Sequence, residues 1–104
     1  MTAFFIVVTI NQSGISFDPA KSHRNEAERG LPFSLVVDLE WDSALIDLDT
    51  RKDYGESRYL VLGLIHGRLH AMVFTPRADK VHVISLRKAN TREVHKYEQS
   101  QNQA

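Results

Sequence analysis

Four side chains in the second half of the chain have the chemistry to bind and cleave a phosphodiester, and they stand in two closely spaced pairs. The pairs are Arg68 with His70 and Ser85 with Arg87. Arginine offers a planar fork that holds phosphate through two hydrogen bonds, and histidine moves a proton near neutral pH. Residues two apart share one side of a strand, so this spacing predicts a phosphate site on an open sheet face. A solvated basic patch without chemistry is the alternative.

Two tight turns are expected to bring these pairs together. The stretches 66–67 and 78–79 indicate two-residue hairpin turns, which predicts strands at 58–65, 68–75 and 80–86. The length of each turn fixes the register of the strands that it joins. The expected pairs are Ile65 with Arg68, Leu62 with Ala71, Arg77 with Lys80, Val73 with Ile84, and His70 with Arg87.

This register assigns the two faces of the strands. One face is apolar and is predicted to be the core beneath the helices: Leu60, Leu62, Leu64, Leu69, Ala71, Val73, Ile84 and Leu86. The other face is mixed and carries the predicted phosphate site: Tyr59, Val61, Ile65, Arg68, His70, Met72, Phe74, Val83, Ser85 and Arg87. Arg58, Arg77 and Lys80, with Glu56 nearby, form a second basic group at the opposite end of the strands. The two groups are separated by about 20 Å along the strands, too far to share one phosphate. They can instead bind successive phosphates of one nucleic-acid strand.

The remaining elements predict an α+β fold. Asp18-Pro19 starts a helix over 19–29 and Gly30 ends it. A short helix begins at Ser34, with Trp41 as its core anchor, and a strand covers 44–48. Strands at 4–8 and 15–17 precede these elements, and a helix from Asn90 or Thr91 to about Gln99 follows them. The expected architecture is an antiparallel β-meander with the N-terminal helices on one face and a C-terminal helix.

Length and composition bound the class of protein. The 104 residues suit one domain over 15–99, with a polar tail at 100–104. Residues 1–14 are either an added edge strand or the product of an upstream start codon. The chain has no cysteine, which excludes disulfides and cysteine–zinc sites, and no apolar run long enough for a membrane span. Residues 1–50 carry three Lys/Arg and eight Asp/Glu, whereas 51–104 carry ten and five. The basic half suits phosphate or an acidic partner, unless the two halves neutralise each other.

The motifs, taken in order over about residues 15–98, resemble those of the BrnT-type toxins. The residues that carry the resemblance are Phe17-Asp18-Pro19-x-Lys21-x3-Asn25, Gly30-Leu31-x-Phe33, Asp42, Gly55-Glu56-x-Arg58, Leu62-Gly63, Gly67-Arg68, Phe74-Thr75-x-Arg77, Ile84-Ser85-x-Arg87-x-Ala89, Glu93 and Tyr97. One departure stands at the end of the first helix, where Glu28-Arg29-Gly30 replaces the usual Lys-His-Gly of the family. If that histidine takes part in the chemistry, its role passes here to another group or is lost.

The resemblance implies a RelE-like fold and a cytoplasmic bacterial ribonuclease toxin of a type II toxin–antitoxin system. Such a toxin cleaves RNA without a metal or cofactor, inhibits translation, and is neutralised by a cognate antitoxin with a ribbon-helix-helix region. Operator DNA is then contacted only through the antitoxin, in a hetero-oligomer. A catalytically inactive toxin-like module that acts with a DNA-binding antitoxin in autoregulation is the alternative, and a structural domain that dimerises through the apolar run 4–8 is another.

Candidate roles follow for the site residues. In RelE-like ribonucleases the ribose 2′-hydroxyl attacks the adjacent phosphate, so charge builds on phosphate oxygens that a clamp must hold. The resemblance points to Arg87 and Arg77 for this clamp, Arg87 first, and His70 is the acid or base expected within reach. The candidate RNA-binding residues are Arg68, Ser85, Arg58, Lys21 and Tyr97. The antitoxin is expected to lay an acidic or amphipathic segment over the face that bears Arg68, His70 and Arg87, or along the neighbouring strand edge.

Two of these assignments leave alternatives open. Tyr97 either positions substrate or packs in the core. Lys21 and Asn25 share one helix face and either line the groove, or Asn25 ties down the following loop. His66 and His70 are expected on opposite faces of their hairpin, so no histidine cluster for a metal is predicted.

Overall fold

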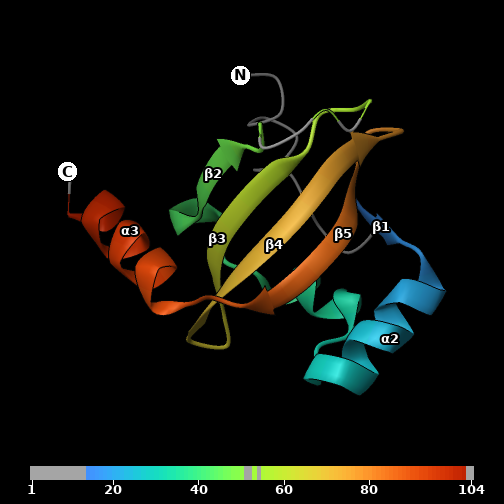
Figure 1. Cartoon of the computed structure of the whole chain (residues 1–104), viewed down its shortest axis with the longest axis horizontal. Coiled ribbons are helices and arrows are strands. Elements are labelled where there is room, and N and C mark those ends of the chain that lie inside the picture. The colour runs from blue at the N-terminus through green and yellow to red at the C-terminus, as the bar shows by residue number, and fades with distance from the viewer. Residues whose placement is uncertain (1–13, 51–52, 54, 103–104) are drawn as a thin grey trace.

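The computed structural model describes residues 14–50, 53 and 55–102, and within them a five-stranded sheet is flanked by two α-helices (Figure 1). The elements are β1 (Ile15–Phe17), α2 (Pro19–Arg29), the 3-10 helices η2 (Phe33–Asp38) and η3 (Trp41–Ser43), β2 (Leu45–Leu48), β3 (Tyr59–Ile65), β4 (Arg68–Arg77), β5 (Lys80–Lys88) and α3 (Thr91–Gln101). The strand order is β1-β5-β4-β3-β2. The predicted strand at 4–8 lies outside the described residues.

The α+β class is confirmed, and the local signals that predicted the helices are visible in their caps. Asp18 accepts a hydrogen bond from the backbone N–H of Ala20 at 2.9 Å, and Gly30 ends α2 with a φ of 72°. At the start of α3, the Asn90 side chain accepts from the Glu93 N–H while the Glu93 carboxylate accepts from the Asn90 N–H. The final helix continues past the predicted end at Gln99, and the predicted second helix is a 3-10 helix.

The sheet is mixed, which corrects the prediction of an antiparallel meander. Strands β2 to β5 pair antiparallel, but β1 pairs parallel with β5, Ser16 opposite His82. The pairing is explained by the alternation of buried and outward-facing side chains, which is the same along β1 and β5. Ile15 and Phe17 pack against the same core as Val81 and Val83, while Ser16 and His82 turn to the other side.

A β-bulge in β5 overturns the predicted register between β4 and β5. The turn pairs Ile65 with Arg68 and Arg77 with Lys80 are confirmed. Phe74 pairs with Val83 but Val73 pairs with Ser85, which leaves Ile84 as one extra residue in β5. Beyond the bulge the predicted pairs of Val73 with Ile84 and His70 with Arg87 are therefore wrong. Arg87 pairs with Ala71, and His70 pairs with Lys88.

The two faces of the sheet also differ from the prediction. The larger core lies on the face with Val61, Ile65, Met72 and Phe74, which we call the η2 face because η2 packs on it. The opposite face, which was predicted to be the main core, carries a smaller cluster under α3: Leu62, Leu69, Ala71, Ala89 and Tyr97, with Leu45, Leu60, Leu64 and Val94 at its edge. We call it the α3 face.

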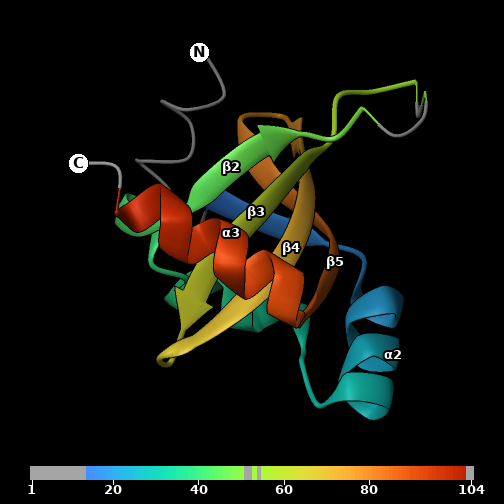
Figure 2. The same ribbon diagram turned by 60° about the vertical axis from the view of Figure 1, so that its left-hand side comes forward.

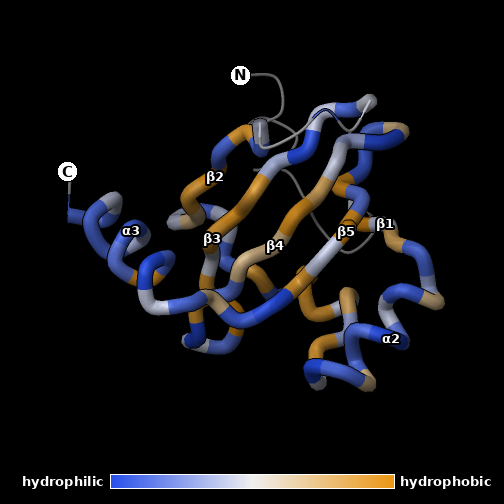
Figure 3. Tube along the Cα trace, in the orientation of Figure 1, coloured by the Kyte–Doolittle hydropathy of each residue, from blue (hydrophilic) through white to orange (hydrophobic). Residues whose placement is uncertain are grey.

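Helix α3 covers only part of the α3 face (Figure 2). The middles of β3 and β4 are hydrophobic, whereas α2, α3 and the last residues of β5 are hydrophilic (Figure 3). Of the helices in the described part of the chain, none has the length and hydropathy to cross a membrane.

Candidate phosphate-binding face

The α3 face carries polar side chains in consecutive rows of β4 and β5, because the bulge brings Ser85 and Arg87 to the side on which His82 lies. Arg87 stands beside Ala71, Ser85 beside Val73, and His82 beside Thr75. Arg77 lies six residues from Ala71 along β4, an even number, so it shares this face. Successive rows are about 7 Å apart along the strands. Both arginines of the predicted clamp thus face the same side, whereas a regular register would have put them on opposite sides.

At one end of this face, Arg87 is held by the first turn of α3. Its Nη1 donates to Oε1 of Glu93 at 2.8 Å, and its Nη2 donates to Oε2 at 2.9 Å. The hydrogen bond from Arg87 lowers the pKa of the Glu93 carboxyl, with the Asn90 N–H adding to the effect. Because Glu93 also caps α3, this bidentate pair ties the helix to β5.

A pocket of about 310 Å³ opens beside Arg87. Leu60, Ala71 and Val73 give it an apolar floor, and Ser85 and Arg87 line one side. The other charged residues at its rim are Lys96, Asp47, Asp49 and Glu93. Lys96 pairs with Asp47 at 3.0 Å. The pocket is therefore lined by two cations and three carboxylates. We call this region the α3 end of the face.

The β1 end of the face holds the second basic group, defined here as Lys21, Arg58, Arg77, Lys80 and His82 with Ser16, Asp18 and Glu56. Nη2 of Arg77 donates to both Glu56 oxygens at 3.2 Å, and Arg58 lies 3.6 Å from the same carboxylate. The hydrogen bond from Arg77 holds the pKa of Glu56 below its usual value. Within the described residues Arg77 makes no further hydrogen bond, so its Nη1 and Nε are available to a ligand.

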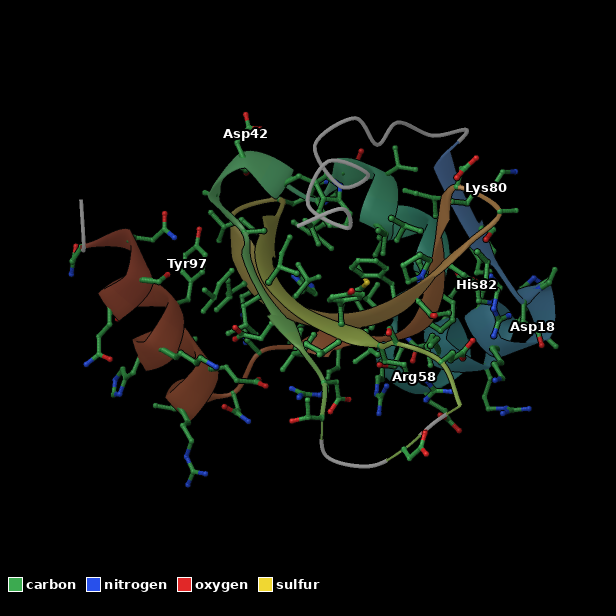
Figure 4. The ribbon with its side chains drawn as sticks, turned by 90° about the horizontal axis from the view of Figure 1, so that it is seen from above. Asp18, Asp42, Arg58, Lys80, His82 and Tyr97 are labelled. Carbon is green, nitrogen blue, oxygen red and sulfur yellow. The ribbon has the colours of Figure 1, made fainter. Side chains whose placement is uncertain are left out.

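His82 is half-buried at the β1 end and was not among the residues predicted from the sequence (Figure 4). Its Nδ1 lies 2.9 Å from Oγ of Ser16 on the neighbouring strand. Burial lowers the pKa of His82, and the charges of Arg77 and Lys21 lower it further, against opposing effects of Glu56 and Asp18. The predicted register also pairs His82 with Thr75, but it assigned that face to the main core. The missed signal is the alternation of Val81, His82 and Val83, in which both valines are buried and His82 is not.

Arg68 and His70 do not join this face, which corrects their expected place beside Arg87. They alternate with Leu69 and Ala71 and therefore belong to the η2 face. His70 is only 4% exposed, and its Nδ1 donates to the carbonyl oxygen of Arg68 at 2.8 Å. Burial lowers the pKa of His70. The predicted role of His70 beside Arg87 depended on their pairing across the strands, and the structure does not show that pairing.

The structure also shows where the three residues with open alternatives lie: Asn25, Tyr97 and Lys21. Asn25 is buried, and its amide donates to the carbonyl oxygens of Leu31 and Leu86 at 2.7 and 2.9 Å, so it ties down the loop after α2. Arg29, at the departure from the family pattern, donates to Asn25 Oδ1 and Leu86 O. Tyr97 packs in the cluster under α3 and donates to Ser43 Oγ at 3.1 Å. Lys21 is exposed near His82.

No three His, Asp or Glu side chains of the described residues lie close enough together to hold a metal ion.

A family model described as ribonuclease toxin, BrnT, of type II toxin-antitoxin system matches residues 17–93, about three quarters of the chain. The matched range includes Lys21, Glu56, Arg77, His82 and Arg87, and it stops at the first turn of α3. No curated protein and no solved structure matches the chain.

Proposed function

Since the chain belongs to the BrnT family of ribonuclease toxins of type II toxin–antitoxin systems, we propose that it cleaves RNA bound across the α3 face. The observation that carries this proposal is that Arg87, Ser85, His82 and Arg77 stand in successive rows on one face of the sheet, each at least partly exposed. An RNA strand that follows β5 meets a hydrogen-bonding side chain in each row. Spaced cationic and polar groups of this kind suit the regular backbone of a single strand.

Charge favours the β1 end for the reacting phosphate. Four cations there, Lys21, Arg58, Arg77 and Lys80, outnumber the carboxylates of Asp18, Glu56 and, in the adjoining turn, Asp79, whereas carboxylates outnumber cations around the pocket at the α3 end. A phosphodiester carries one negative charge and gains more as its transition state forms, so it is stabilised best where cations are in excess.

Arg77 is the better placed of the two clamp candidates, which reverses the order expected from the sequence. The guanidinium of Arg87 is engaged on both terminal nitrogens by Glu93, whereas Arg77 uses Nη2 alone. We therefore assign Arg77 to the reacting phosphate, with Arg58 and Lys21 beside it. Arg87 and Ser85 hold a flanking part of the strand next to the pocket.

The proposed reaction is metal-independent and uses the ribose 2′-hydroxyl as nucleophile, so the products are a 2′,3′-cyclic phosphate and a 5′-hydroxyl. The proposed partner is a cognate antitoxin of the ribbon-helix-helix type, which reaches operator DNA itself and forms a hetero-oligomer with this chain. Its acidic segment is expected to lie on the α3 face and to cover the β1 end. Arg68 and His70, which the sequence placed in the docking surface, are on the opposite face and are left uncovered. Covering this face would block RNA directly.

A pair of double variants tests the proposal. Arg77→Ala/Lys80→Ala removes two cations from the α3 face, and Arg68→Ala/Lys88→Ala removes two cations from the η2 face. With excess EDTA present, cleavage of a single-stranded RNA should persist in the wild type and the control double variant. In the first variant it should fall by about 10²- to 10³-fold, as for loss of a transition-state donor.

Two results would contradict the proposal. Equal cleavage by the two folded double variants would show that RNA does not react on this face. A wild-type protein that binds its antitoxin but cleaves no RNA, with or without divalent ions, would favour the inactive binding module.

A further inference from the structure

We propose that His82 is the general base of the cleavage, accepting through Nε2 the proton of the attacking ribose 2′-hydroxyl; this assignment rests on the proposed ribonuclease function. His82 lies on the α3 face one row from Arg77, on the adjacent strand. A diagonal pair of this kind has side chains close enough for one substrate group to contact both. The base and the phosphate clamp then meet at one nucleotide.

Ser16 fixes the imidazole in the orientation that a base requires. Nδ1 of His82 lies 2.9 Å from Ser16 Oγ, and the two residues are direct partners in the parallel ladder of β1 and β5. When Nδ1 is protonated, its N–H donates a hydrogen bond to Ser16 Oγ, and Nε2 then carries the free lone pair. Among the described residues Nε2 has no hydrogen-bond partner, so this lone pair is available to a 2′-hydroxyl.

Partial burial favours the neutral imidazole that a base must have before reaction, and the charged groups around His82 act on the same pKa. They come from three elements: Arg77 on β4, Glu56 in the loop before β3, and Asp18 and Lys21 at the start of α2. Partial burial and the cations Arg77 and Lys21 lower the pKa of His82, and the two carboxylates only partly offset them. Near neutral pH the imidazole is therefore unprotonated and able to accept a proton.

The step balances without a further reactant. Nε2 takes the proton of the 2′-hydroxyl while the 2′ oxygen bonds to phosphorus and the bond from phosphorus to the 5′ oxygen breaks. The departing 5′ oxygen receives a proton from solvent water, and the imidazolium returns its proton to solvent. Arg77 donates to the phosphate oxygens on which charge accumulates.

Other titratable groups suit this role less well. The carboxylate of Glu56 accepts from Arg77 and contacts Arg58, and its lowered pKa makes it a weak base. His70 is buried on the η2 face. His66 stands at the β3–β4 turn, where Nε2 lies 2.9 Å from Asp38 Oδ2.

The test compares His82→Gln with His66→Gln, an exposed histidine outside the site, over a range of pH. Wild type and His66→Gln should lose kcat/KM as pH falls through the pKa of His82, because protonation removes the base. His82→Gln should cleave about 10²- to 10⁴-fold more slowly and lose this acidic limb. Added imidazole should partly restore cleavage by His82→Ala, which a purely structural role would not predict.

A second measurement needs no variant in the site. The imidazole pKa of His82, followed by NMR in the wild-type protein, should match the kinetic pKa of the acidic limb. A mismatch would overturn the assignment, as would a folded His82→Gln variant that keeps the rate and the pH profile of the wild type. A wild-type protein that cleaves no RNA at all would instead reject the proposed function itself.

Discussion

The two ends of the α3 face hold arginines whose guanidinium groups differ in how fully protein carboxylates engage them. At the α3 end, Arg87 forms a bidentate pair with Glu93 inside the capping box of a helix, in a pocket where carboxylates outnumber cations. At the β1 end, Arg77 shares Glu56 with Arg58 and adjoins a half-buried histidine. Two of its guanidinium nitrogens have no hydrogen-bond partner among the residues that the structure describes. The same residue type is therefore structural at one end and available to a substrate at the other.

The role of a motif arginine is therefore assigned from its hydrogen-bond partners rather than from its place in the motif. A guanidinium whose fork is already filled by a carboxylate must lose that pair before it binds phosphate bidentately. The β1 end is thus the proposed reaction centre, and the α3 end holds the helix and a flanking stretch of RNA.

The largest expected effect separates the two arginines by kinetics. Arg77→Ala should lower kcat/KM for RNA cleavage by about 10²- to 10³-fold with little change in KM, because it removes a donor that acts in the transition state. Arg87→Ala should lower kcat/KM by about tenfold, mainly through KM. Steady-state cleavage of a short fluorescent RNA measures both. A larger loss of kcat for Arg87→Ala than for Arg77→Ala would reverse the comparison.

The next effect concerns stability and should be confined to the α3 end. Arg87→Ala and Glu93→Ala should each lower the free energy of unfolding, and their double variant should lose less than the sum, with a coupling of about 1 kcal/mol. Urea denaturation of the four proteins measures the cycle. Additive losses would show that the bidentate pair does not hold α3.

Antitoxin association should depend on the β1 end and on salt. Long-range attraction to four clustered cations speeds encounter and is screened over about 8 Å at physiological ionic strength. The Arg77→Ala/Lys80→Ala variant should therefore associate more slowly than the wild type at low salt and respond less to added salt. Stopped-flow association rates decide the matter, with Arg68→Ala/Lys88→Ala on the η2 face as the control. An antitoxin that docks elsewhere would bind both variants at the wild-type rate.

The smallest effect is a pH dependence of stability from the η2 face. Burial lowers the pKa of His70 in the folded protein, so the unfolded chain binds the proton more tightly. Stability should fall as pH drops below about 6.5, the unfolded value, toward the lower folded pKa. In His70→Gln this decline should be shallower, as thermal melts at two pH values would show. An unchanged slope would mean that His70 is not protonated differently in the two states.

Much of the fold could be predicted from the sequence because the signals are local. Asp18-Pro19 and Gly30 delimit α2, Asn90 and Glu93 begin α3, and the turns at 66–67 and 78–79 set the register near each turn. Each depends on a few adjacent residues and their backbone preferences.

The bulge and β1 could not be predicted in the same way. The extra residue Ile84 is accommodated because Val83 and Leu86 both pack into the larger core, a tertiary effect with no local turn or cap to announce it. That one residue moved Ser85 and Arg87 to the face opposite His70, where His82 already lay, and so changed the composition of the candidate site. The parallel pairing of β1 joins residues far apart in the sequence.

The most direct test of RNA binding on the α3 face is an NMR titration of the wild-type protein. The ligand is a short RNA whose 2′-hydroxyls are methylated, so that it binds without being cleaved. Backbone amide shifts should cluster in the rows of Arg77, His82, Ser85 and Arg87, and leave Arg68 and His70 unchanged. Shifts that gather instead at the β3–β4 turn and the η2 face would contradict the account.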